Sequence, residues 1–128
     1  MKIIISVIIA LTAMGSFAQS QTNVSSIASP DKDIVYRLFP TQNFWTFIKL
    51  NTRNGQMWQV QYSTKDDKKE VPLSLTARVS SEKETNGRFF LYPTQNMFNF
   101  ILLDQIDGRV WQVQWSIKAK ERKVIPIE

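Results

Sequence analysis

The sequence contains no cysteine and no histidine, and only four glycines among its 128 residues. Without cysteine there are no disulfides, and without both residue types the usual zinc sites and the common nucleophile–base pairs of hydrolases are excluded. Histidine ligation of a haem iron is excluded as well. A hydrophobic content of 43% is typical of a folded chain. We therefore expect one globular domain that is held by its core, with no metal site and no cofactor.

Long hydrophobic runs are also absent, except near the N-terminus. Lys2 precedes an apolar run over 3–13, and small residues at Ser16 and Ala18 fit a cleavage after residue 18. This pattern predicts a secretory signal peptide over 1–18, and a retained membrane anchor is the alternative. The run is shorter than the roughly 20 residues that cross a bilayer, and no cysteine is present for lipidation. We expect a periplasmic or secreted protein with a flexible lead over 19–33.

An internal repeat is the most informative feature of the sequence. Phe-Pro-Thr-Gln-Asn at 39–43 returns as Tyr-Pro-Thr-Gln-Asn at 92–96, which is 53 positions later. The segments 39–71 and 92–124 align without a gap, and 15 of their 33 positions are identical. This identity within one chain predicts that the two segments share one structure.

Each repeat is predicted to form a β-meander. Asn54-Gly55 and Asp107-Gly108 are strong hairpin signals, because both dipeptides adopt positive φ at little cost. The flanking segments are rich in aromatic and branched residues or alternate in polarity, as strands do. The expected strands are 36–39, 44–51, 56–64 and 71–75 in repeat 1, and 88–92, 97–104, 109–117 and 124–127 in repeat 2. The linker over 76–87 has room for a short helix over 80–85.

We therefore expect an all-β single domain over 34–128, made of repeat 1 (35–75) and repeat 2 (88–127). The two tandem β-meander repeats would form one pseudo-twofold small barrel or sandwich of six to eight antiparallel strands. The run over 103–111 is also similar to propeller blades that carry a Trp near the end of a strand. A propeller needs about four blades or more, so this chain would form one only by assembly of several copies.

Alternation in the third strand of each repeat predicts which side of each sheet is buried. One face carries tryptophan and valine and is expected to be buried, while the opposite face carries glutamines and is expected to be in water. The members of the first face are Trp58, Val60, Tyr62, Trp111, Val113 and Trp115. We call these two sides the Trp face and the Gln face of each repeat.

The strand over 44–51 is apolar on both sides, so its register stays open. A two-residue turn at Asn54-Gly55 would pair Phe47 with Tyr62 and place Ile48 beside the glutamines. A three-residue turn with a bulge would reverse this grouping. In either register some large apolar side chains lie on the nominal outer face, so both faces are covered or one carries an exposed aromatic patch.

The glutamines of the third strands are the first candidate binding residues: Gln59, Gln61, Gln112 and Gln114. An amide offers a donor and an acceptor together, which suits sugar hydroxyls or a peptide backbone. Trp45 and Phe98 would add stacking groups to form a glycan-binding platform. The alternative is that these glutamines form the solvated side of a half-exposed sheet.

Acidic and basic residues give weaker signals. Asp104 and Asp107 flank the second hairpin, and paired carboxylates hydrolyse glycosides in some enzymes. No acid–base set with orienting partners appears, so we expect no enzyme. The basic clusters over 65–69 and 118–123 are interrupted by acids, which is typical of solvated hairpin tips. We expect no nucleic-acid binding, and only weak, salt-sensitive attraction to anionic surfaces.

The run over 92–116 combines Tyr-Pro-Thr-Gln-Asn-Met, Phe-Ile-Leu-Leu-Asp and Asp-Gly-Arg-Val-Trp-Gln-Val-Gln-Trp-Ser, and the segment 39–63 matches it. This string resembles a group of small exported proteins of Gram-negative bacteria that have no assigned function. The resemblance implies export and the repeated β-unit, and it brings no activity, ligand or catalytic residue.

The sequence thus favours an exported, non-enzymatic binding module for a glycan or another envelope component. One alternative is a protein–protein or oligomerisation module that acts through a strand edge or an aromatic patch, including a homo-oligomer. Another alternative is a hydrolase that uses Asp104 or Asp107.

Overall fold

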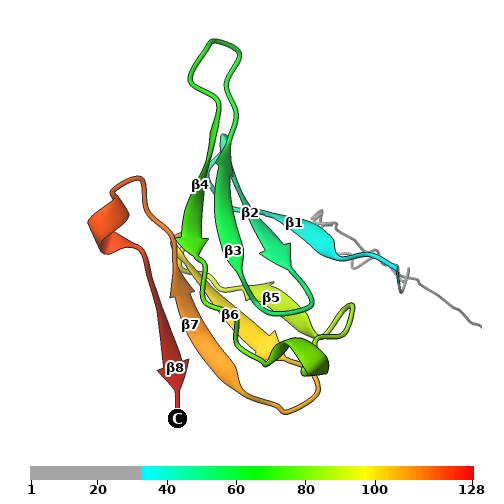
Figure 1. The fold of residues 1–128 in the computed structure, drawn as a ribbon. Coiled ribbons are helices and arrows are strands. Elements are labelled where there is room, and N and C mark those ends of the chain that lie inside the picture. The colour runs from blue at the N-terminus through cyan, green and yellow to red at the C-terminus, as the bar shows by residue number, and fades with distance from the viewer. Residues whose placement is uncertain (1–32) are drawn as a thin grey trace, which may run out of the picture.

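The computed structural model describes residues 33–128, which form two four-stranded antiparallel sheets packed against each other (Figure 1). The first sheet has the order β1-β2-β3-β4 and the second has the order β5-β6-β7-β8. The predicted all-β fold of two tandem β-meanders is confirmed as a sandwich. Within residues 33–128 the sheets stay separate and do not close into a barrel. The predicted signal peptide and nearly all of the predicted lead lie outside the described residues.

The strands agree with the predicted segments to within a few residues. Repeat 1 contains β1 (Tyr36–Pro40), β2 (Thr46–Asn51), β3 (Met57–Gln61) and β4 (Lys69–Ser74), and repeat 2 contains β5 (Phe89–Pro93), β6 (Asn99–Asp104), β7 (Val110–Gln114) and β8 (Lys123–Ile127). Within residues 33–128 there are also two short 3₁₀ turns, η2 (Ser81–Lys83) in the linker and η3 (Ala119–Glu121) before β8. The first of these lies within the predicted short helix.

The hairpin between β2 and β3 has a four-residue loop, so both turn lengths considered from the sequence are wrong. Phe47 pairs with Val60, and the Asn51 N–H donates to the Gln56 carbonyl at 2.9 Å. Gly55 has a φ of 85°, which only glycine adopts at little cost. The pairing differs by two positions from that of a two-residue turn, so it keeps the same parity and places Ile48 opposite Gln59.

The hydrophobic core lies between the two sheets. In repeat 2 the predicted Trp face is buried there, because Trp111, Val113 and Trp115 are all at most 8% exposed. The remaining core residues come from β1 to β6: Phe39, Ile48, Leu50, Met57, Leu73, Phe89, Leu91, Phe100 and Leu102.

Repeat 1 buries the opposite face, and here the prediction is wrong. Gln59 and Met57 are fully buried between the sheets, whereas Trp58 and Val60 are half-buried and Tyr62 is exposed. The physical reason is that β2 carries the charged Lys49 on the side of Trp58, where repeat 2 has the buried Leu102, whereas Ile48 and Leu50 on the side of Gln59 are aliphatic and fully buried. The amide of Gln59 enters the core with them because its polar atoms find partners there.

The alignment of the two repeats also needs a correction at the fourth strand. Trp58 pairs with Pro72, and Trp111 pairs with Pro126, so the offset there is 54 and not 53. The connection between β7 and β8 is one residue longer than that between β3 and β4. The apparent match of Val71 with Val124 is therefore not a structural equivalence, because the counterpart of Val71 is Ile125.

Candidate functional site

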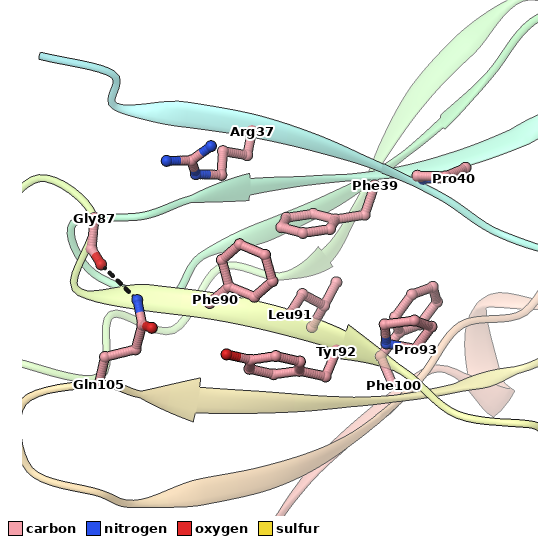
Figure 2. A pocket seen from close by; sticks show the side chains of 10 residues that line it. All are labelled: Arg37, Phe39, Pro40, Gly87, Phe90, Leu91, Tyr92, Pro93, Phe100 and Gln105. Atoms are coloured by element: carbon pink, nitrogen blue, oxygen red, sulfur yellow. Dashed lines mark hydrogen bonds between the residues drawn. The ribbon is translucent and has the colours of Figure 1, made fainter. Parts of the chain in front are cut away.

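One apolar cleft of about 370 Å³ lies between β1 and β5, the first strands of the two sheets. The rings of Phe39 and Phe90 pack edge to face in it, with their centroids 5.1 Å apart, and Tyr92 lies beside them (Figure 2). Polar groups at its margin include the Arg37 guanidinium and Gln105, whose Nε2 donates to the Gly87 carbonyl at 2.9 Å. None of the six predicted site residues lines this cleft.

Two further cavities occupy equivalent places in the two repeats, and four of the six predicted residues line them. The cavity of repeat 1 has a volume of about 260 Å³, and that of repeat 2 about 340 Å³. Four positions are shared at the offset of 53: Trp45 and Phe98, Gln61 and Gln114, Tyr62 and Trp115, and Ser63 and Ser116. Each cavity therefore combines two aromatic rings, an amide and a serine.

The Pro-Thr-Gln-Asn motif explains why both cavities have an aromatic residue at the same place. In repeat 1 the Thr41 hydroxyl donates to the Thr46 carbonyl at 2.7 Å, and Asn43 Oδ1 accepts the Trp45 N–H at 2.8 Å. In repeat 2 the same two bonds recur, with Asn96 Oδ1 accepting the Phe98 N–H at 2.9 Å. Short polar side chains that bond nearby backbone fix such turns. The motif thus positions the aromatic ring and does not itself line the repeat 1 cavity.

In the repeat 1 cavity one polar atom has no partner. Trp45 stacks on Phe44 with the centroids 4.8 Å apart and is tilted against Tyr62 at 5.0 Å. Among the buried side-chain nitrogen and oxygen atoms of residues 33–128, Gln61 Oε1 is the one without a hydrogen-bond partner. Leaving such a group unsatisfied costs about 1–3 kcal/mol, so a donor supplied by a ligand would be favoured. Asp67 completes the lining with Lys69, beside the amide.

In the repeat 2 cavity the equivalent groups are tied to the connection before β8. Phe98 is tilted against Trp115 with the centroids 5.0 Å apart. Gln114 Nε2 donates to the Glu121 carbonyl at 2.9 Å, and the Ser116 hydroxyl donates to Glu121 Oε1 at 3.2 Å. Lys118 also lines this cavity, so each site holds one carboxylate and one ammonium beside its aromatic rings.

The other two predicted residues, Gln59 and Gln112, lie outside both cavities. Gln59 Nε2 donates to the Ser116 carbonyl at 3.0 Å, and its Oε1 accepts the Ser116 N–H at 3.1 Å. Gln59 is thus a buried link between the repeats, and the expectation that it faces water is wrong. Gln112 is exposed as expected, and its Nε2 donates to Asn99 Oδ1 at 2.8 Å.

Asp104 belongs to a buried ion-pair cluster. Its side chain is inaccessible to solvent and lies 2.9 Å from both the Arg88 Nε and the Arg109 guanidinium. Burial by itself would raise the pKa of Asp104, but hydrogen bonds from Arg88, from the backbone N–H groups of Asp107 and Ile106, and from Arg109 lower it well below its usual range. A permanently ionised carboxylate is a poor general acid. The cluster instead fixes the loop between β6 and β7, where Asp107 also pairs with Arg88.

Several lining residues were missed by the sequence reasoning. The alternation predicts Tyr62 and Trp115 as core residues, which is correct for Trp115 and wrong for Tyr62, and the charge pattern predicts Asp67 and Glu121 at solvated hairpin tips. Serine stands at the same position of both repeats, at Ser63 and Ser116, and this identity could have marked the two serines as candidate site residues. Asp67 and Glu121 do not align at the offset of 53, because the connection before β8 contains one extra residue, so the comparison of the repeats does not mark them.

Within residues 33–128 there is no group of three or more acidic residues that could hold a metal ion. Over the same residues, no helix has both the length and the apolar character needed to cross a bilayer. Comparison with protein-family models, with curated proteins and with solved structures gives no match. The resemblance to small exported proteins therefore stays a prediction.

Proposed function

We propose that the protein is an exported, non-enzymatic glycan-binding module with one binding site in each repeat. The observation that carries this proposal is the duplication of the cavity. The same four positions line it in both repeats, although the aromatic residue changes from Trp45 to Phe98 and from Tyr62 to Trp115. Concave sites that combine aromatic rings with a few polar groups are typical of small-molecule recognition.

The chemistry of the lining suits a sugar. The apolar face of a pyranose packs on an aromatic ring, while amide, hydroxyl and carboxylate groups bond its hydroxyls. Trp45 is 39% exposed and offers an accessible ring for this contact. Gln61 lines the cavity, and rotation of its amide toward the cavity would let a sugar hydroxyl donate to Oε1, which removes the cost of leaving that acceptor unsatisfied.

Calorimetric titration against glycans and peptidoglycan fragments tests the proposal. We expect two bound ligands per chain, and one after either Trp45→Ala or Phe98→Ala, because each substitution removes the stacking ring of one site. The double variant should not bind. Leu75→Ala removes an exposed apolar side chain outside both cavities and serves as the matched control.

Two outcomes would contradict this function. Absence of binding to every glycan of the panel would reject it, and binding to an envelope protein alone would favour the interaction module. Binding that survives the double substitution would place the site elsewhere, with the cleft between β1 and β5 as the next position to mutate.

A further inference from the structure

The two sheets bury opposite faces although they are copies of one unit. Repeat 2 places its Trp face in the core, with Trp111 and Val113, whereas repeat 1 places its Gln face there, with Met57 and Gln59. A twofold axis between the sheets would bury the same face of both. The repeats are therefore stacked head to tail, and the Gln face of the first sheet covers the Trp face of the second.

This exchange of faces holds along all four strands. In β2 the fully buried Ile48 and Leu50 correspond to the half-buried Ile101 and Leu103 of β6. In the first strands Phe89 and Leu91 are fully buried, and their counterparts Tyr36 and Leu38 are 52% and 54% exposed. In the fourth strands Val71, which pairs with the buried Gln59, is half-buried, and its counterpart Ile125, which pairs with Gln112, is exposed.

Head-to-tail stacking leaves one Trp face and one Gln face uncovered. The uncovered Trp face of repeat 1 carries Tyr36, Leu38, Phe47, Trp58 and Val60. The uncovered Gln face of repeat 2 carries Tyr92, Ile101, Leu103, Ile125 and Ile127. These two faces are the counterparts of the pair that forms the core, so each matches the other in position and largely in apolar character.

We propose that other copies of this chain cover both uncovered faces, so that copies join head to tail into a closed ring. The Gln face of repeat 2 in one copy would pack on the Trp face of repeat 1 in the next. The contact inside the chain is the template for the contact between chains, which is why the partner is identified as another copy. The two charges on the uncovered Trp face, Lys49 and Glu70, neutralise each other in an ion pair, so they present no net charge to a partner.

The polar contact between the two sheets of one chain predicts an equivalent contact between neighbouring copies in the ring. Inside the chain, Gln59 exchanges two hydrogen bonds with the Ser116 backbone across the sheets. The counterparts of these residues are Gln112, which is exposed, and Ser63. In the ring the amide of Gln112 would therefore reach the Ser63 backbone of the next copy.

Ring closure follows from the heterologous nature of the contact. A head-to-tail interface repeats until the rotation between units closes, and otherwise it continues as a filament. Four-stranded sheets stacked in this way close as propellers of about four to eight blades. With two sheets per chain, a ring would contain two to four copies.

Light scattering after size-exclusion chromatography gives the first test. We expect the purified protein to have two to four times the mass of one chain. Leu38→Glu damages only the Trp face, and Ile125→Glu damages only the Gln face, so each variant alone should have the mass of one chain. Both residues are exposed in the single chain, so the substitutions leave the core intact, which circular dichroism verifies.

Mixing the two variants separates this proposal from a symmetric dimer. Each variant retains one good face, and the two retained faces are complementary, so an equimolar mixture should form a complex of twice the single-chain mass and no larger. Ile117→Glu, at an exposed site in the connection before β8, is the matched control and should leave the ring unchanged. A monomeric parent protein at about 0.1 mM, a filament, or a mixture that stays monomeric would each overturn the proposal.

Discussion

Gln59 and Gln112 occupy the same position of the two repeats, and we predict very different effects when each is replaced by alanine. Gln59 is fully buried and bonds the Ser116 backbone with both its oxygen and its nitrogen, at 3.1 and 3.0 Å. Gln112 is exposed and bonds only the side chain of Asn99. The two substitutions are chemically identical, so any difference in stability comes from the surroundings.

The expected magnitude for Gln59→Ala follows from the groups that it leaves behind. The Ser116 N–H loses its partner inside the core, which costs about 1–3 kcal/mol. The Ser116 carbonyl keeps the Arg122 Nε at 2.8 Å, so it adds little. The void left by the side chain adds a further cost, for a total of about 3 kcal/mol. Gln112→Ala should change the free energy of unfolding by less than about 0.5 kcal/mol.

Urea and thermal unfolding measure both values. For a domain of this size a loss of about 3 kcal/mol corresponds to a fall of roughly 15 °C in Tm. Both substitutions are made together with Leu38→Glu, so that a contact between copies does not contribute to the effect of Gln112. Equal losses for the two variants, or a loss below about 1 kcal/mol for Gln59→Ala, would refute the inference that the repeats bury opposite faces.

Two further predictions concern the hairpin loops. Because the pKa of Asp104 is lowered in the folded state, its contribution to stability is present above about pH 4, the ordinary pKa of the group, and is lost as the pH falls toward the folded value. Asp104→Asn should therefore cost about 3–5 kcal/mol in urea unfolding at pH 7 and much less near pH 2, and an equal cost at both would contradict the ion-pair explanation. Gly55→Ala and Gly108→Ala both place a side chain at positive φ, which costs about 1–2 kcal/mol each. Gly55→Ala should cost more in thermal unfolding, because its Cβ would lie 3.1 Å from the Arg78 side chain, whereas nothing lies within 4 Å at Gly108, and the reverse order would count against this packing.

The sequence predicts the strands, the hairpins and the duplication well, because these features depend on local patterns that each repeat carries twice. It predicts the buried face correctly only in repeat 2. The third strand alone favours the Trp face, since polar residues alternate with apolar ones there. The partner sheet decides which face of a sheet is buried in the core. The pattern within the third strand alone contains no information about that partner sheet. The cavity residues were predicted in part, at Trp45, Phe98, Gln61 and Gln114, because an aromatic ring and an amide recur at fixed positions in both repeats.

The apolar character of both faces of the second strand is the sequence feature that distinguishes head-to-tail stacking from twofold packing. In a twofold sandwich each unit buries the same face, so the other face is free to be polar throughout. In a head-to-tail stack each type of face is buried in one unit, so a duplicated unit keeps apolar residues on both. Phe47, Ile48 and Leu50, with their counterparts Phe100, Ile101 and Leu103, follow this second rule. Lys49, in place of Leu102, is the exception expected where a face is uncovered in the single chain and buried only by another copy.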